Sequence, residues 1–515
     1  MSSVLLIRPL CDGDEPEFAE PLGIERLAGY LRAHGVPDVR VFDRRLFAKR
    51  QRAGIASEGD PGFFDALKCT FPAGLEPQLV GLSLMTSADV SDARRIISRL
   101  HAWWPKARFA VGGVYVTGAP DAVVTAFPSF VTPLCGEGEL SLLAMARACA
   151  DGCGDSGGEN GAQDVDAPRT SSDERSWSDG KFVASANHSR DDASLLPFGG
   201  FDAVTPDEWA VPFRPDLELY AALGCAVNMQ TSRGCPGRCA FCATPNLPDR
   251  LRRWQARDLR LVADEMHHEA KRLAAAGLPP VFNFVDDDFG PLERLEDLAE
   301  ELNRRGLHTA FACEMRFASL AGQHELAERL LRLHEAGLTR VFFGIESLNR
   351  ETLTRWRKPL NLQAFPGVLD AFRQAHVDVQ IGYILWHAHQ TVEGACEEVQ
   401  ELHRLGVYSH RAALGRLIVF PGCALAAEGS NNRGFQLMGS REEAFVQQFE
   451  ESARGFAGEY VRSLVAEPYL AARAFLTGDM APLKEVRQHI DSVNEQSYNL
   501  FMQMSQDWKR GRCSL

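Results

Sequence analysis

The sequence predicts an α/β protein in which two parallel sheets are followed by a helical region. Residues 4–140 alternate short apolar strands with amphipathic helices, which is the order of a Rossmann-like, doubly wound parallel sheet. Residues 227–419 repeat the alternation in about six strand–helix units, which favours a partial (β/α)6 barrel over a complete eight-unit one. Residues 426–515 have the pattern of helices rich in Phe, Tyr and Met.

A chain of 515 residues is too long for one hydrophobic core, so several domains are expected. We predict a doubly wound domain over residues 1–150 and a barrel domain over 196–425. Between them, residues 151–195 are rich in Gly, Ser, Asp and Glu, which is typical of a flexible linker. A C-terminal helical domain would occupy residues 426–515.

Composition limits the location and the partners of the protein. No apolar run approaches the roughly 20 residues of a membrane span, and the first residues lack the basic flank of a signal peptide. The 13 cysteines are scattered except for one cluster, which indicates a metal site in a reducing compartment. A net charge of -14 argues against nucleic acid. We therefore expect a cytoplasmic protein that acts on a small molecule or a peptide.

Strands and helices of the first domain follow from short apolar runs and helical periodicity. Small residues follow the predicted strands: Ser83 and Met85 end one of them, and Gly112 and Gly113 follow the next. Because small residues at the carboxyl ends of parallel strands let a ligand approach the backbone, this edge is the expected binding site. Each motif alone is weak, since glycines end strands in many proteins. The expected strands are 4–7, 39–42, 79–84 and 109–111, with helices near 24–34 and 90–103.

The clearest chemical motif is a C-x3-C-x2-C loop after the first predicted barrel strand, formed by Cys235, Cys239 and Cys242. Three thiolates hold three irons of a four-iron cluster and leave the fourth iron open to another ligand. The alternative is a structural zinc site, which usually needs four ligands. No further Cys or His lies within ten residues downstream, and Cys225 upstream has no close cysteine partner in the sequence.

This loop resembles that of the radical S-adenosylmethionine (SAM) superfamily, which commonly has an aromatic residue, here Phe241, before the last cysteine. The resemblance implies a [4Fe-4S] cluster whose open iron binds SAM, and one-electron cleavage of SAM to a 5'-deoxyadenosyl radical. An electron donor such as flavodoxin or ferredoxin is then expected.

The resemblance also implies SAM contacts at the ends of the barrel strands. An acidic turn at 286–288 would receive the ammonium group of SAM, although a solvated acidic loop has the same composition. The segment 344–347 resembles the GIES sequence near the ribose, and Lys358 would pair with a carboxylate, unless it is only solvated. The implied SAM contacts are Phe241, Asp286, Asp287, Arg316, Glu346, Ser347, Lys358 and Pro421.

One segment departs from the family pattern. Many relatives have G-x-P-G-E-T after the fifth strand, whereas this chain has Trp386, His387 and His389 between residues 386 and 391. These side chains either face the substrate or pack at a domain interface.

In front of the barrel, the order and spacing of the small residues resemble the cobalamin-binding domain of the cobalamin-dependent radical SAM class. Residues 8–15 contain no histidine, so the resemblance implies cobalamin bound without a histidine on cobalt. A degenerate domain that binds nothing is the alternative. The implied cobalamin contacts are Ser83, Met85, Gly112, Gly113, Val114, Gly136, Glu137 and Gly138.

Together these features predict a cobalamin-dependent radical SAM methyltransferase that methylates an unactivated carbon of a small molecule or peptide in secondary-metabolite biosynthesis. The first alternative is a cyclisation, rearrangement or ring contraction without methyl transfer. An alternative of another class is a cobalamin-binding sensor or partner protein. No motif names the substrate or a catalytic side chain.

Overall fold

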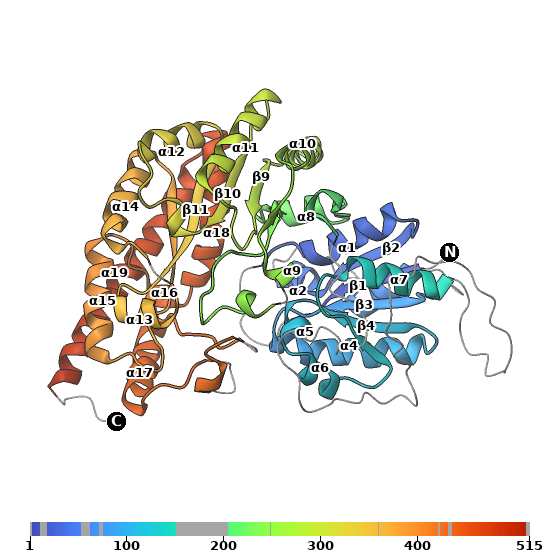
Figure 1. Ribbon diagram of the computed structural model, residues 1–515, viewed down its shortest axis with the longest axis horizontal. Coiled ribbons are helices and arrows are strands. Elements are labelled where there is room, and N and C mark those ends of the chain that lie inside the picture. The colour runs from blue at the N-terminus through green and yellow to red at the C-terminus, as the bar shows by residue number, and fades with distance from the viewer. Residues whose placement is uncertain are drawn as a thin grey trace. The chain divides into compact units, whose positions relative to one another are not determined.

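The computed structural model describes residues 3–10, 18–52, 62–71, 76–150, 204–247, 249–358, 360–420, 423–430 and 435–510 (Figure 1). The chain forms two compact units. The first consists of Met1–Glu15, Pro21–Val204 and Trp209–Arg214, and the second of Pro16–Glu20, Thr205–Glu208 and Pro215–Leu515. The predicted linker at 151–195 lies outside the described residues, and the division into four domains stays a prediction.

The first unit is built on a five-stranded parallel sheet with the order β2-β1-β3-β4-β5. This order, in which the chain reverses direction between β1 and β3, is that of a doubly wound sheet and confirms the predicted fold. The central strands β1, β3 and β4 are mostly buried because helices cover both faces. Their bounds are β1 Ser3–Arg8, β2 Asp38–Asp43, β3 Leu79–Ser83, β4 Arg108–Gly112 and β5 Val131–Pro133.

Two apolar cores lie on opposite faces of this sheet. On one face, alternate strand residues such as Val4 and Leu6 pack against α1 and α7. On the other, Leu5 and Ile7 pack with residues of α3, α4, α5 and α6. The helices are α1 Leu22–Ala33, α2 Arg44–Arg52, α3 Phe63–Thr70, α4 Val90–Trp103, α5 Val114–Gly118, α6 Pro120–Ala126 and α7 Gly138–Ala150.

The second unit contains a parallel sheet of five strands with the order β12-β11-β10-β9-β6. A sixth strand was expected near Leu417. Among the described residues there, no sixth strand pairs with the sheet. An isolated parallel bridge instead joins Trp386, just beyond β12, to Arg416, and Trp386 bonds to Gly415 and Leu417. The strands are β6 Val227–Met229, β9 Val281–Phe284, β10 Ala310–Met315, β11 Leu338–Glu346 and β12 Asp378–Tyr383, and a small antiparallel pair consists of β7 Ser232–Arg233 and β8 Gln255–Ala256.

Helices connect these strands and bury one face of the sheet. Alternate residues of β10, such as Phe311 and Cys313, enter the large core together with the helices, so Ala312 and Glu314 point to the other face. The connecting helices are α8 Leu217–Ala222, α9 Asp249–Arg252, α10 Leu259–Ala275, α11 Leu292–Arg304, α12 Leu326–Glu335, α13 Arg350–Arg355, α14 Phe365–Gln374, α15 Val392–Arg404 and α16 His410–Ala413.

Three helices follow the barrel: α17 Ser440–Ala457, α18 Tyr460–Thr477 and α19 Ala481–Lys509 (Figure 1). They confirm the predicted helical region. Helix α18 packs on the first residues of the strands, where Ala472 contacts Val281 and Ala310. The carboxyl-terminal ends of the strands therefore lie at the end of the sheet away from α18.

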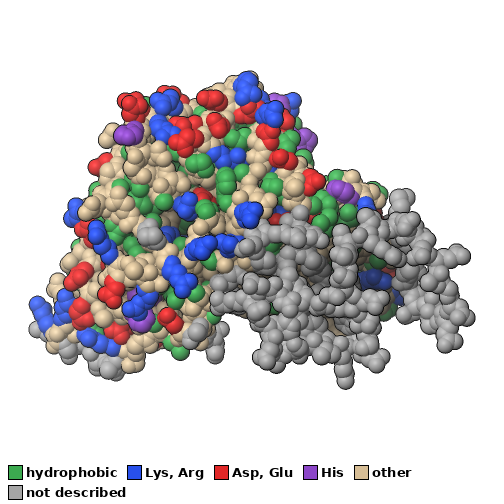
Figure 2. Space-filling model, in the orientation of Figure 1, with side chains coloured by type: hydrophobic (Ala, Val, Ile, Leu, Met, Phe, Trp, Pro, Cys, Tyr) green, Lys and Arg blue, Asp and Glu red, His purple; other side chains and the backbone are tan. Residues whose placement is uncertain are grey.

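Ion pairs attach α18 and α19 to the same strand starts. Glu467 bonds to Arg340 of β11 and, at 2.8 Å, to Nε of Arg487, which also pairs with Asp378 of β12. Over the face of the second unit seen in Figure 2, acidic and basic side chains are interspersed. None of the described helices combines the length and the apolar character that a membrane crossing needs.

We predict that Glu467→Ala lowers the free energy of unfolding of the second unit by about 3 kcal/mol, because two arginines lose their shared buried carboxylate. Burial raises the pKa of Glu467, but Arg340 and Arg487 outweigh it, so the pKa is lowered below 4.5. A lowered pKa means that this stabilisation is present above pH 4.5 and is lost as the pH falls through the folded-state pKa. Urea unfolding at pH 7 and pH 4 measures both effects. An equal loss for Glu467→Ala at the two pH values would contradict the ion-pair explanation.

Candidate active site

The cysteine loop leaves β7 at the carboxyl end of the barrel sheet and is fixed by backbone hydrogen bonds. The N–H of Cys235 donates to Arg252 C=O at 3.2 Å, and the N–H of Ala240 donates to Trp356 C=O at 2.8 Å. Gly234 has φ 77°, and a Cβ there would lie 2.6 Å from the Arg253 carbonyl oxygen. Only glycine therefore allows the loop to pass so close to that backbone.

The three thiols are partly buried, and Gly237 lies between two of them. A Cβ at Gly237 would be 3.3 Å from Cys235 Sγ and 3.8 Å from Cys239 Sγ, and its N–H faces Cys235 Sγ at 3.4 Å. Burial raises the pKa of the Cys235 thiol to about 11, and the pKa of Cys239 is raised for the same reason. Iron is the kind of partner that deprotonates such thiols, and an N–H directed at sulfur suits a bound cluster.

Asp286 ties the end of β9 to the start of the cysteine loop. Its buried carboxylate accepts hydrogen bonds from the Thr231 N–H at 2.7 Å, the Thr231 hydroxyl at 2.9 Å and the Ser232 N–H at 2.5 Å. Burial raises the pKa of Asp286 to about 6. The structure thus gives this predicted SAM contact a positioning role within the protein, while Asp287 is the exposed carboxylate of the turn.

Asp288 completes the acidic turn by holding Arg316. Its carboxylate accepts from Arg316 Nε at 2.7 Å, and its carbonyl oxygen accepts from Trp254 Nε1 at 2.8 Å. Arg316 keeps 42% of its side chain exposed and lies close enough to Cys235 for its charge to lower the pKa of that thiol in part. The predicted residue Arg316 therefore stands beside the loop with its orientation fixed.

Glu346, Lys358 and Phe241 come together next to Cys239. Lys358 Nζ lies 2.8 Å from Glu346 Oε1 and 5.7 Å from the centre of the Phe241 ring. The charges of both Lys358 and Glu346 act on the Cys239 thiol. Glu346 has φ 68°, a strained conformation for a residue with a side chain, at an irregularity in the pairing of β11 with β12. Such strain is often found at functional sites.

Two glycines make room for this ion pair, and the sequence analysis did not single them out. Gly344 of β11 lies beside Gly382 of β12. A Cβ at Gly344 would be 2.1 Å from Glu346 Oε1 and 2.7 Å from Lys358 Nζ, and one at Gly382 would be 3.5 Å from Glu346 Oε2. The carboxylate of Glu346 thus turns back over both strands. The glycine of the GIES segment was the available signal.

Ser347 points into the protein. Its hydroxyl donates to Glu398 at 2.8 Å, and the same carboxylate accepts from the Leu348 N–H at 2.9 Å and from Gln390 Nε2 at 2.8 Å. The Tyr383 hydroxyl donates to it as well. This buried network fixes the turn that carries Glu346. The predicted contact Pro421 lies outside the described residues.

The segment that departs from the family pattern divides between two environments. Trp386 packs against Phe445 and Phe501 of the C-terminal helices, with ring centres 5.8 and 6.2 Å away. His387 instead packs on Trp356 at 5.0 Å, and burial lowers its pKa to about 4. The side chain of His389, by contrast, is half-exposed and lies 3.7 Å from Glu428.

In the first unit, the loop after β3 is tied to β1 by a buried ion pair. Arg8 Nη1 lies 2.9 Å from Asp89 Oδ2 and donates to Ser83 C=O at 2.8 Å. Asp89 also accepts from the N–H groups of Met85 and Thr86. The predicted residues Ser83 and Met85 therefore lie at the reversal point of the sheet, where ligands bind in folds of this kind.

The loop after β4 passes very close to the loop after β3. Gly113 has φ 105°, and a Cβ there would be 2.5 Å from the Leu84 carbonyl oxygen, while one at Gly112 would be 3.4 Å from that of Leu134. Met85 and Val114 at this edge are 47% and 55% exposed. A glycine-lined edge with exposed apolar side chains fits a large, partly apolar ligand such as cobalamin.

The last predicted cobalamin contacts follow β5. Gly136 has φ 81°, and its N–H donates to Thr117 Oγ1 at 3.0 Å, which joins this loop to α5, the helix that follows β4. Gly138 begins α7, where a Cβ would be 3.2 Å from Leu27 Cδ2. Glu137 lies between them. The three loops thus meet at one edge of the sheet.

Comparison with known proteins agrees with this geometry. Residues 229–398 match the family model of the radical SAM superfamily. Bacteriochlorophyllide d C-12(1)-methyltransferase of Chlorobaculum tepidum is 28% identical over 187 residues, which are 36% of this chain and 38% of that relative. Cytidylyl-2-hydroxyethylphosphonate methyltransferase of Streptomyces wedmorensis is 24% identical over 81% of this chain and 78% of its own length.

Among solved structures, the cobalamin-dependent SAM radical enzyme OxsB, with aqua-cobalamin and SAM bound, is similar with a TM-score of 0.61 and 14% identity. The similarity covers 100% of this chain and 82% of that one. Residues 229–398, which carry the thiol loop and most of the barrel, match a radical SAM domain, and this match favours an iron–sulfur cluster over the zinc alternative. The fold of the chain is similar to that of the cobalamin-dependent enzyme OxsB.

We predict that Gly344→Ala reduces SAM cleavage at least tenfold, because the added methyl group displaces both Glu346 and Lys358. Production of 5'-deoxyadenosine by the reconstituted enzyme, reduced with dithionite, measures the effect. The control is Gly367→Ala in α14, where a Cβ meets nothing within 4 Å and activity should be kept. Equal activities of the two variants would show that the Glu346–Lys358 pair has no part in SAM cleavage.

Proposed function

We propose that this protein is a cobalamin-dependent radical SAM methyltransferase that methylates an unactivated carbon of a small molecule or peptide in secondary-metabolite biosynthesis. The observation that carries the proposal is the presence, in one chain, of a three-thiol loop on a partial barrel and a glycine-lined ligand edge on a doubly wound sheet. Methyl transfer is supported by the two methyltransferase relatives and by the cofactors bound to OxsB.

In this proposal the thiols of Cys235, Cys239 and Cys242 hold the cluster, and the exposed groups beside them bind SAM. Asp287 offers its carboxylate to the ammonium group. Arg316 is held by Asp288 in reach of the loop, so it is suited to a carboxylate. The cofactors, when bound, supply a carbon-centred radical and a transferable methyl group, and the protein supplies alignment.

The Glu346–Lys358 pair is proposed to bind the ribose and carboxylate side of SAM. Its two charges neutralise each other, so a ligand meets directed hydrogen-bonding groups without a net charge. Trp356 packs edge-on against Phe241 at 5.5 Å and keeps one side of this region apolar. Exclusion of water protects a radical from side reactions.

Cobalamin is proposed to lie on the edge formed by the loops after β3, β4 and β5. Met85 and Val114 would contact its ring, and Gly112, Gly113 and Gly136 would leave room for its nucleotide tail. No histidine occurs in residues 8–15, so we propose that none of these residues coordinates cobalt. An electron donor of the flavodoxin or ferredoxin class is the proposed partner.

A second candidate is a cyclisation or ring contraction without methyl transfer. It is retained because OxsB, similar over the whole chain, is described as a cobalamin-dependent radical enzyme without reference to methylation. A cobalamin-binding sensor is disfavoured, since a sensor does not require the aligned thiol loop and Glu346–Lys358 pair.

For the main test we predict that SAM with a trideuterated methyl group transfers all three deuterons to the product. Two molecules of SAM should be consumed for each product, one as methyl donor and one as source of the radical. Mass spectrometry of product and of 5'-deoxyadenosine measures both quantities. Cys239→Ala, which lacks one cluster ligand, is the control and should give neither. If the substrate is changed without taking up label while 5'-deoxyadenosine is formed, the result would favour the rearrangement alternative over methyl transfer.

A separate prediction concerns the first unit. Gly113→Ala should weaken cobalamin uptake at least tenfold, because its Cβ would lie 2.5 Å from the Leu84 carbonyl oxygen and push the loops apart. Absorbance of protein-bound cobalamin after gel filtration measures the uptake, and thermal unfolding checks that the unit is folded. Gly23→Ala in α1, where a Cβ has free space, is the matched control. Normal uptake by a folded Gly113→Ala would place the ligand elsewhere.

A further inference from the structure

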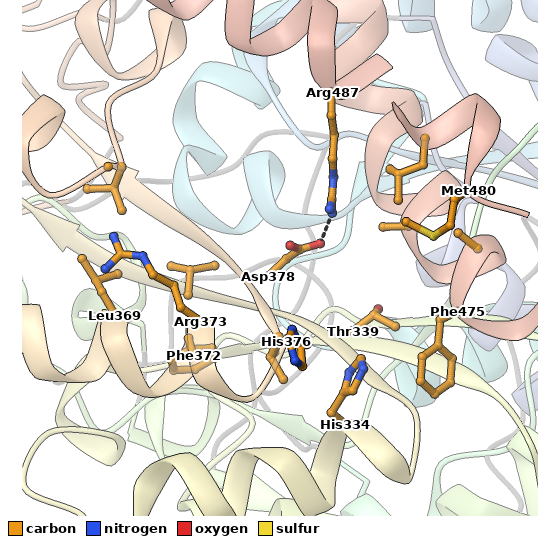
Figure 3. Close-up of a pocket in the computed structure, with 17 residues that line it drawn as sticks. His334, Thr339, Leu369, Phe372, Arg373, His376, Asp378, Phe475, Met480 and Arg487 are labelled. Carbon is orange, nitrogen blue, oxygen red and sulfur yellow. Dashed lines mark hydrogen bonds and ion pairs between the residues drawn. The ribbon is translucent and has the colours of Figure 1, made fainter. Parts of the chain in front are cut away.

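A pocket of about 560 Å³ lies in the second unit at the amino-terminal ends of β11 and β12, the end opposite to the thiol loop (Figure 3). Its walls come from six helices and strands: α12, β11, α14, β12, α18 and α19. In Figure 3 the rings of His334 and His376 stand side by side, with Phe475 on one side and Phe372 on the other. The volume is within the range of small-molecule sites.

His376 occupies a backbone position that is taken by glycine after four other helices of the second unit. The helices α10, α11, α12 and α15, which also lead toward strands of the barrel, are each followed by a glycine with positive φ: Gly277, Gly306, Gly337 and Gly406. Helix α14 ends in the same way, with the Val377 N–H donating to Phe372 C=O, but its residue with positive φ, at 58°, is His376.

A histidine is less stable than glycine at such a position, because its Cβ crowds the backbone in the left-handed region. The imidazole of His376 enters the pocket, where its ring centre lies 6.5 Å from that of His334. Local strain that places a polar ring in a cavity is the pattern of a binding site.

Two side chains of the pocket offer hydrogen-bond acceptors. His334 Nδ1 lies 2.9 Å from Leu338 C=O, and since a carbonyl only accepts, Nδ1 carries the proton and Nε2 of the neutral ring is an acceptor. The Thr339 hydroxyl donates to Phe311 C=O at 3.2 Å, so its remaining lone pair also accepts. A ligand with a hydrogen-bond donor therefore finds an acceptor in the pocket.

The charged groups of the lining are already paired. Arg487 bonds to Asp378 and to Glu467, as the dashed line in Figure 3 shows for the first of these. Arg373 donates to Asp370 and to Leu405 C=O. A charged ligand would thus break an existing pair, whereas a neutral one would not.

We propose that this pocket is a second ligand site, separate from the cluster region, for a neutral, planar aromatic molecule with an O–H or N–H group at its edge. The ring of the ligand packs between Phe475, Phe372 and the aliphatic wall. Its donor group bonds to Nε2 of His334, and the imidazole of His376 packs against its ring. The proposal does not depend on the reaction assigned to the enzyme.

Isothermal titration of the full chain with 2-naphthol tests the site, with 2-methoxynaphthalene as the matched ligand without a donor and 2-naphthoate as the anion. We expect 2-naphthol to bind at least fivefold more tightly than either of the other two, as one hydrogen bond is worth about 1 kcal/mol. Equal binding of 2-naphthol and 2-methoxynaphthalene, or no binding at all, overturns the proposal.

His376→Gly separates a binding role from a structural one. Glycine suits the left-handed backbone, so the thermal unfolding temperature should stay the same or rise, while 2-naphthol affinity should fall about fivefold. The control Glu325→Gly also places glycine at a position with φ 52°, outside the pocket, and should leave the affinity unchanged. Unchanged affinity in His376→Gly overturns the proposal. His334→Phe, which keeps a ring and removes the acceptor, should weaken binding to the same extent.

Discussion

The geometry of the thiol loop depends on one buried carboxylate. Asp286, at the end of β9, accepts hydrogen bonds from Thr231 and Ser232, which precede the cysteines. Because an unpaired carboxylate is costly to bury, the two segments have one stable arrangement. The adjacent carbonyl of Asp288 then bonds to Trp254, and its carboxylate fixes Arg316. These contacts position the loop without using the sulfur atoms of the cysteines, which stay available to bind metal.

Near the end of β11, two further carboxylates have different tasks: one supports the backbone and the other faces the site. Glu398 is buried among four donors and fixes the turn, whereas Glu346, two residues after Gly344, is turned toward the open side with Lys358. The strained backbone of Glu346 persists because the buried hydrogen bonds to Glu398 fix the turn that follows it. Rigid support of this kind is what a radical reaction needs, since a small displacement of a reacting atom changes its rate greatly.

Local sequence signals predicted most of the fold and part of the site. Apolar runs located the strands of the second sheet and four strands of the first, but not the short β5, and the cysteine spacing located the loop. The partners of Asp286 lie 55 and 54 residues away in the chain, so composition did not reveal that this carboxylate is internal. Ser347 and Glu398 are likewise joined only by folding. The strand expected near Leu417 is replaced by isolated bridges at Arg416 and Ile418, because apolar character alone does not decide how many residues pair.

The position of α18 affects how the chain folds while the ribosome synthesises it. This helix covers the first residues of the barrel strands. It contacts β9, although more than 170 residues of the chain separate the two elements. During synthesis on the ribosome the barrel therefore waits with Val281 and Ala310 uncovered until α18 has emerged, whereas the first sheet, whose strands end at Pro133, is complete much earlier. The thiol loop spends this interval attached to an unfinished sheet. Delivery of iron and sulfide is best timed after release of the chain, when the loop has its final shape.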